Sequence, residues 1–168
     1  LRQHFGVVFQ NDILFADTIF ENINFGRGLT RKEVAAAAEY AQALPFIENL
    51  SKGFDSEVAA MGTNFSGGQK QRMLISRALA AHPEILILDD SSSALDYKTD
   101  AALRKALREH FTGTTSIIVA QRISSIYQCD HVMVLEDGQC VGYGTHEELM
   151  KNCEIYREIH ESQMRAEA

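Results

Sequence analysis

The sequence predicts an α/β domain with a largely parallel sheet, and three observations point to this fold class. Short apolar runs typical of buried strands alternate with segments whose apolar residues recur at helical spacing. Several helical segments open with Ser or Thr followed three residues later by Glu or Gln, the pattern of a helix N-terminus. The chain has 168 residues, 45% of them hydrophobic and 23% charged, which is enough for one domain with a substantial core.

The first part of the chain is predicted to contain one buried strand and several helices. A helix opens at Thr30, with Glu33 completing a capping box, and runs to about Gln42. The pattern of residues 18–25 is ambiguous. The other expected elements are a strand over 5–9 (FGVVF), a break over 10–14, a short helix over 44–50 and a loop over 51–64. We expect residues from about 28 to 64 to form an all-helical lobe inserted between strands.

The helix that begins at Ser66 has the strongest pattern in the chain, and Pro83 is expected to stop it. Its apolar residues are Met73, Leu74, Ile75, Ala78, Leu79 and Ala80. The next expected elements are a strand over 85–88 that is apolar on both faces, and an amphipathic helix over 99–111 with Leu103, Ala106 and Leu107 on one face. A buried strand over 116–120 follows, and then a hairpin of 130–135 and 140–143 around Asp137-Gly138. The chain is expected to end with a helix opened by Thr145 and Glu148 and an exposed, charged final helix.

Composition excludes some classes of protein. The net charge is −7, and no run of Lys and Arg suggests a nucleic-acid-binding surface, so we expect no nucleic-acid partner. No run approaches the roughly 18 apolar residues of a membrane span. The chain begins with Leu and reaches a strand-like run almost at once, so we expect it to be cut from a longer polypeptide. Cys129, Cys140 and Cys153 are widely spaced, as expected of reduced thiols rather than a zinc site.

Two short patterns carry the candidate chemistry. Residues 85–90 (ILILDD) place two carboxylates at the carboxyl end of a buried strand, where open α/β sheets bind ligands. Asp89 is suited to hold Mg²⁺ directly or through water, and Asp90 to polarise a water molecule for attack on a phosphate. The alternative is that both acids cap the next helix or face solvent.

The second pattern is SGGQ, at residues 66–69. A capping box explains Ser66 and Gln69 but not the two glycines between them. A glycine inside a helix costs about 1 kcal/mol relative to alanine. Gly67 and Gly68 therefore favour a close approach to the backbone, and the bare amides of a helix N-terminus attract an anion such as phosphate.

In this order and at this spacing, these patterns resemble the ATP-binding cassette (ABC) family. Residues 64–96 (NFSGGQKQRMLISRALAAHPEILILDDSSSALD) resemble its signature motif, the following helix, the Walker B strand and the D-loop. Residues 7–26 resemble the exporter-type segment around the Q-loop glutamine, here Gln10, and residues 138–150 resemble the C-terminal hairpin and helix. The resemblance covers essentially the whole chain.

The resemblance implies a partial RecA-like P-loop NTPase core with an inserted α-helical ABC subdomain. Residues of about 11–82 would form the helical subdomain, and 83–168 the Walker B, D-loop, switch and C-terminal regions. ATP would lie between two such domains, with Ser66, Gly67, Gly68 and Gln69 binding nucleotide held by the partner domain. Asp96 would lie in the D-loop at that interface. Gln10 would contact Mg²⁺ or water and report to the transmembrane domain.

Three departures from the family pattern matter. The phosphate-binding motif G-x-x-x-x-G-K-[ST] is absent from these residues, so this chain alone is expected to bind ATP poorly. Asp90 occupies the position of the catalytic Glu, which shortens its reach by about 1.5 Å. Gln121 stands in place of the switch His, and Gln can donate a hydrogen bond but cannot take up a proton.

Together these departures resemble the degenerate-site subunit of a heterodimeric multidrug or lipid exporter. Its own site would be slow, with Asp90 and Gln121 in the catalytic positions, while its intact signature would serve the partner. A homodimer that tolerates both changes is the alternative. The resemblance thus implies an ATPase that drives export at the cytoplasmic face of the cell membrane, from which this soluble piece derives. A soluble ABC ATPase without a transporter, and a regulatory half that only binds nucleotide, are the competing functions.

Overall fold

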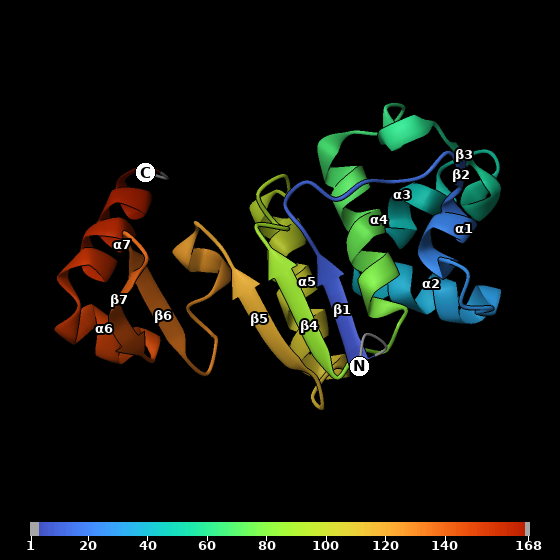
Figure 1. Cartoon of the computed structure of the whole chain (residues 1–168). Coiled ribbons are helices and arrows are strands. Elements are labelled where there is room, and N and C mark those ends of the chain that lie inside the picture. Colours follow the sequence, from blue (N-terminus) through green and yellow to red (C-terminus); the bar gives the residue numbers. More distant parts are fainter. Residues whose placement is uncertain (1–3, 167–168) are drawn as a thin grey trace. The chain divides into compact units, whose positions relative to one another are not determined.

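The structure is a computed structural model that describes residues 4–166. It forms two compact units, the first ending at Val119 and the second beginning at Ala120 (Figure 1). Each unit is described by itself below. Across the described residues, no helix is both long enough and apolar enough to cross a membrane.

A three-stranded parallel sheet forms the centre of the first unit, which confirms the expected α/β class (Figure 1). Its strands are β1 (Phe5–Val8), β4 (Ile85–Asp89) and β5 (Thr115–Val119), in the order β1-β4-β5. Gly6 pairs with Leu86 and Val8 with Leu88, so these four residues line one face, and that face is buried.

The prediction of a buried strand over 116–120 is wrong in its burial. β5 is an edge strand with one neighbour, and four of its five residues are exposed. Ile117 and Val119 are about half exposed, at 50% and 53%. Ile117 pairs with Ile87, whose side chain is only half-buried, so both lie on the less covered face of the sheet. The apolar run therefore predicted the strand correctly but did not predict how many strands pair with it.

The helices of the first unit are α1 (Ile19–Asn24), α2 (Arg31–Tyr40), α3 (Leu44–Glu48), α4 (Gly67–Leu79) and α5 (Tyr97–His110). Two of them, α2 and α4, begin at the predicted capping boxes, whereas the helix predicted over 99–111 begins two residues earlier, after Asp96. Thr30 with Glu33, and Ser66 with Gln69, both form complete capping boxes. The ambiguous segment 18–25 is mostly α1, with Thr18 as its N-cap.

The expectation of an all-helical lobe over 28–64 is wrong in one place. Glu57 and Val58 form the short strand β3 (Glu57–Val58), which pairs antiparallel with β2 (Asp17–Thr18). The pair is too short to show a period in the sequence. It forms because Val58 is buried and the neighbouring Ser56 carbonyl accepts the Ile19 amide at 3.0 Å. Two 3₁₀ turns, Gly53–Asp55 and Ala60–Gly62, flank β3.

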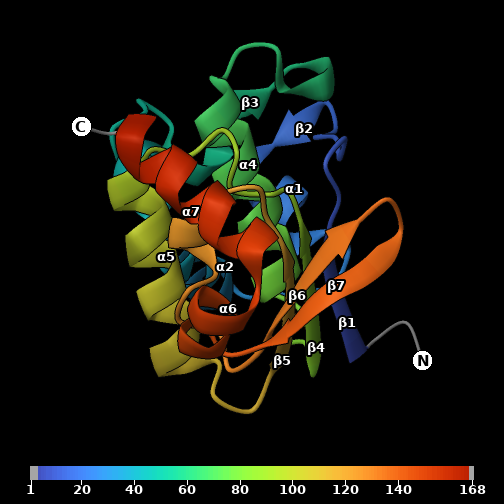
Figure 2. The ribbon, with the colours of Figure 1, turned by 90° about the vertical axis from the view of Figure 1, so that its left-hand side faces the viewer.

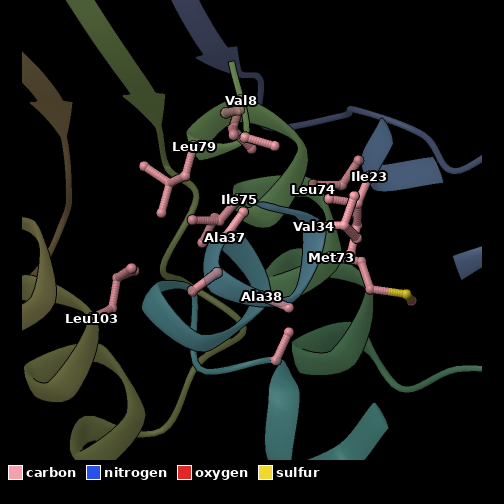
Figure 3. Close-up of a cluster of buried hydrophobic side chains, with 14 of the residues drawn as sticks. Val8, Ile23, Val34, Ala37, Ala38, Met73, Leu74, Ile75, Leu79 and Leu103 are labelled. Atoms are coloured by element: carbon pink, nitrogen blue, oxygen red, sulfur yellow. The ribbon is translucent and has the colours of Figure 1, made fainter. Parts of the chain in front are cut away.

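One buried cluster joins the helices of this unit to the sheet (Figure 3). All six apolar residues predicted for the helix after Ser66 are buried in it. Val34, Ala37 and Ala38 of α2, Ile23 of α1 and Leu103 of α5 belong to the same cluster. The signature-like helix α4 is therefore the packing centre of the helical part, through the buried residues that follow its first turns.

The second unit is a hairpin covered on one side by two helices (Figure 2). β6 (Val132–Glu136) and β7 (Gln139–Gly144) turn at Asp137 and Gly138, which both have positive φ, as a type I′ turn requires. α6 (His146–Asn152) opens with the predicted Thr145 capping box. The final helix α7 (Glu154–Ala166) is charged as expected, but not wholly exposed, because Tyr156 is buried against the hairpin core.

Candidate functional site

The carboxyl ends of β1 and β4 bring two of the predicted site residues together. Gln10 follows β1 by two positions, and Asp90 follows β4 directly. Because these strands are parallel neighbours, their ends meet at one edge of the sheet. Gln10 Nε2 donates to Asp90 Oδ2 at 3.4 Å, a long contact that holds the two side chains side by side. Asp89, the last residue of β4, lies half-buried at the same edge.

Asp90 has an unusual backbone for a residue with a side chain. Its φ is +46°, in the left-handed region, which aspartate tolerates better than most residues. Two hydrogen bonds hold it there: its amide donates to the Val119 carbonyl at 3.0 Å, and its carbonyl accepts the Ser93 hydroxyl at 2.9 Å. The chain therefore turns sharply at Asp90, and the turn sets the direction of the carboxylate.

The SGGQ segment forms the N-terminus of α4 as predicted. The Ser66 amide donates to Gln69 Oε1 at 2.9 Å, and the Gln69 amide donates to Ser66 Oγ at 3.3 Å. Ser66 and Gly67 are exposed, so the start of the helix is accessible to a ligand.

The structure adds a second reason for the glycines. A Cβ at Gly68 would lie 3.0 Å from the Ala94 carbonyl oxygen, and one at Gly67 would lie 3.6 Å from Ala94 Cβ. The segment 90–96 therefore packs closely against the start of α4. Part of the glycine requirement comes from this internal contact, at Gly68 above all, whereas Gly67 has room for a methyl group.

Asp96 is the N-cap of α5. Its Oδ1 accepts the Thr99 amide at 2.9 Å, and its Oδ2 accepts the Thr99 hydroxyl at 2.7 Å. These two hydrogen bonds, the amide first, lower the pKa of Asp96 below its ordinary value. The carboxylate is exposed and charged at neutral pH, but its local role is to cap a helix.

Gln121 lies in the second unit, just after the end of β5. Its carbonyl accepts Gln163 Nε2 at 2.7 Å, and Gln163 Oε1 accepts the Ile123 amide at 2.9 Å. Gln163 on α7 thus ties down the backbone around Gln121, whose side chain is exposed. Each unit carries part of the predicted residue set, and Gln10, Asp89, Asp90, Asp96 and the SGGQ segment all belong to the first.

Sequence reasoning missed a buried arginine that supports this site. Arg77 of α4 donates to the Ile13 carbonyl at 3.0 Å, to the Asn22 carbonyl at 2.8 Å and to Asn22 Oδ1 at 2.9 Å. Its guanidinium also lies over the rings of Phe15 and Phe25. Burial is the main cause that lowers the Arg77 pKa, against the opposing charge of Asp12.

The signal for Arg77 was present in the sequence. Arg77 stands among the apolar positions of α4, one residue before Ala78, where an exposed arginine is not expected. A polar residue inside a predicted core face indicates a buried hydrogen-bond network. Here that network ties the segment after Gln10 to the helix that begins with SGGQ.

Comparison with known proteins identifies the family. A family model described as ABC transporter matches residues 1–93, and the chain belongs to this family. The expected resemblance to the ABC family is thereby confirmed. The ATP-binding domains of ABC transporters are ATPases.

Individual relatives agree with the family. The chain is 42% identical over 166 residues to an uncharacterized ABC transporter ATP-binding protein of Bacillus subtilis, covering 98% of this chain. It is 43% identical over 164 residues to a putative multidrug export ATP-binding/permease protein of Staphylococcus aureus, covering 97% of this chain. It spans 28% of the length of each of these two relatives.

A solved structure shows the same architecture. A bacterial Atm1-family ABC exporter with ATP bound matches this chain with a TM-score of 0.92 and 39% identity. The match covers 97% of this chain and 29% of the exporter chain. The fold class is thus that of an ABC nucleotide-binding domain, and the exporter character rests on the relatives.

Proposed function

We propose that this chain is part of the ATP-hydrolysing domain of an ABC exporter, at the cytoplasmic face of a membrane, where ATP hydrolysis drives substrate transport. The observation that carries the proposal is the meeting of Gln10 Nε2 and Asp90 Oδ2, 3.4 Å apart, at the end of two parallel strands. The same unit carries the accessible SGGQ helix start. Residues of about 11–82 would form the helical subdomain and 83–168 the remaining core. The transmembrane domain is one proposed partner.

The residues at the sheet edge fit a magnesium nucleotide. Mg²⁺ prefers oxygen ligands and is usually bound through one or two carboxylates together with water and substrate phosphates. Asp89 and Gln10 offer a carboxylate and a carboxamide oxygen at the same edge. When bound, the ion would neutralise phosphate charge. The proposed contribution of Asp90 is to orient a water molecule. The proposed contribution of Gln121 is to donate a hydrogen bond to a phosphate oxygen.

We further propose a second partner, a nucleotide-binding domain of different sequence that would bind ATP together with this one. Asp90 has a shorter reach than glutamate, and a displacement of about 1 Å can cost on the order of a hundredfold in rate. Gln121 cannot take up a proton. Ser66, Gly67, Gly68 and Gln69, together with Asp96, would then serve the competent site, whose catalytic base lies on the partner. A homodimer with two slow sites is the alternative.

The deciding experiment uses the whole natural protein in lipid vesicles, alone and with its candidate partner. We expect slow ATP hydrolysis alone and at least about tenfold faster turnover in the mixed assembly, because only the mixture contains a competent base opposite this SGGQ. Equal turnover in both would favour the homodimer. Absence of hydrolysis in both would contradict the ATPase assignment.

Asp90 and Gln121 also favour one second candidate, a regulatory half that binds nucleotide without hydrolysing it. A single-turnover assay with the purified whole protein separates the two functions. Slow release of phosphate within the first turnover supports an ATPase, whereas retained, intact ATP supports the regulatory half. The relatives named as exporters give no support to a soluble ABC ATPase without a transporter.

A further inference from the structure

A buried ion pair lies under the segment that joins Asp90 to α5. Asp100 and Arg104 stand one turn apart in α5, and only 4% and 8% of their surfaces are exposed. Arg104 Nε lies 3.3 Å from Asp100 Oδ1. Removing two charges from water costs several kcal/mol per ion, and replacing such a pair by apolar residues is often neutral for stability. Helix stability alone therefore does not explain the pair.

Arg104 also reaches out of its helix. Its Nη2 donates to Ser92 Oγ at 3.3 Å, and Ser92 is itself 4% exposed. Ser92 lies two residues after Asp90 in the segment 90–96, and its carbonyl accepts the Leu95 amide at 3.0 Å. The buried pair is thus anchored to the middle of the segment rather than to its ends.

The segment 90–96 touches both candidate phosphate-facing regions. At one end, the Ser93 hydroxyl donates to the Asp90 carbonyl at 2.9 Å, next to the left-handed turn that sets the Asp90 carboxylate. In its middle, the Ala94 carbonyl oxygen lies 3.0 Å from the position that a Cβ on Gly68 would take. A small shift of this segment would therefore move Asp90 and press on the start of α4 together.

We propose that the Asp100–Arg104 pair is a positioning device that fixes the segment 90–96 through Ser92. It keeps the Asp90 carboxylate and the SGGQ glycines at a constant separation. Asp100 and Arg104 act through this segment and are positioning residues. The consequence for turnover rests on the proposed function, whereas the consequence for the segment does not.

The test compares single and paired substitutions in the whole natural protein. Arg104→Met removes the cation that lies 3.3 Å from the buried Asp100 carboxylate, and a fall in melting temperature is expected. The double variant Asp100→Leu/Arg104→Met removes both charges, so its melting temperature should return close to that of the unmodified protein. It still lacks the anchor to Ser92. Hydrogen exchange across 90–96 should then be at least about tenfold faster.

Kinetics provide the readout that a purely structural role would not change. In the double variant kcat should fall at least about tenfold, because a displaced catalytic group slows the chemical step. KM for ATP should stay within about twofold, since nucleotide binding is not the function lost. Leu107→Ala is the matched control: it weakens the packing of α5 but does not touch Ser92, and it should leave exchange across 90–96 and kcat unchanged.

Ser92→Ala is the second variant and removes the hydroxyl that accepts from Arg104. It should raise exchange across 90–96 in the same direction but less than the double variant does. Unchanged exchange in both variants overturns the proposal, and so does faster exchange with an unchanged kcat. An unmodified protein without ATPase activity would instead contradict the proposed function, and the exchange measurement alone would then decide the positioning role.

Discussion

The two regions of the first unit proposed to face phosphate are built differently. At the sheet edge, Gln10 and Asp90 meet through one long contact of 3.4 Å, and Asp90 sits at a left-handed turn. At the start of α4, Ser66 and Gln69 exchange two hydrogen bonds, and Gly68 fits closely against Ala94. The side chains that meet at the sheet edge, where Asp90 departs from the family pattern, are joined by a longer contact than the two hydrogen bonds at the start of α4. The proposal that SGGQ serves another subunit can therefore be tested region by region.

The largest expected effect comes from placing a charge at the start of α4, in the SGGQ segment. Gly67→Asp puts a carboxylate at the accessible start of α4, where a partner's phosphate would bind. Turnover of the assembled exporter should fall by about a thousandfold, comparable to losing an anion-stabilising donor. Gly67→Ala is the control, because a Cβ there makes only an ordinary contact of 3.6 Å with Ala94. Full turnover with Gly67→Asp would show that the glycines do not face phosphate.

The next effect concerns the link between the two regions. Arg77→Met removes three hydrogen bonds made by α4, one to the Ile13 carbonyl in the segment after Gln10 and two to Asn22 of α1. The Ile13 and Asn22 carbonyls then lose the donor that Arg77 supplies. The free energy of unfolding should fall by about 3 kcal/mol, measured by chemical denaturation of the whole protein. Arg31→Met, which breaks an exposed pair with Asp55, should cost less than about 1 kcal/mol. Equal losses for the two variants would mean that the Arg77 network adds nothing.

A smaller, opposite effect is expected at the sheet edge. Asp90→Glu restores about 1.5 Å of reach, the length of one carbon–carbon bond. Single-turnover hydrolysis at this subunit's own site should rise about tenfold. The same substitution one residue earlier, Asp89→Glu, lengthens a side chain proposed to hold Mg²⁺ and should lower the rate. A rate that does not respond to Asp90→Glu would assign the slow site to Gln121 alone.

The smallest effect concerns how the stabilising contribution of Asp96, the N-cap of α5, depends on pH. The folded-state pKa of Asp96 is lowered, first by the Thr99 amide and then by the Thr99 hydroxyl. Its stabilising contribution is therefore complete above the unfolded pKa of about 3.9 and is lost as pH falls through the lower folded value. The difference in melting temperature between the unmodified protein and Asp96→Asn should be constant from pH 7 to 5 and shrink in stronger acid. A difference that grows in acid would contradict this sign.

Much of the local structure could be predicted because it depends on neighbours in the sequence. Capping boxes at Thr30, Ser66 and Thr145 are four-residue patterns, and the Asp137-Gly138 turn is a two-residue one. The burial of β5 could not be predicted, because an apolar run does not report how many strands flank it. β3 was missed because two residues show no period.

The sequence by itself determined the class of fold, the starts of the helices that open with a capping box, the family and the identity of the candidate residues, because each depends on local pattern or motif spacing. Only the tertiary structure brought Gln10 to Asp90, packed Ala94 onto Gly68, and buried Arg77, Asp100 and Arg104. These are contacts between residues distant in the chain or between a side chain and a distant backbone. Burial turns an ordinary charged residue into one whose partners must be supplied by the fold.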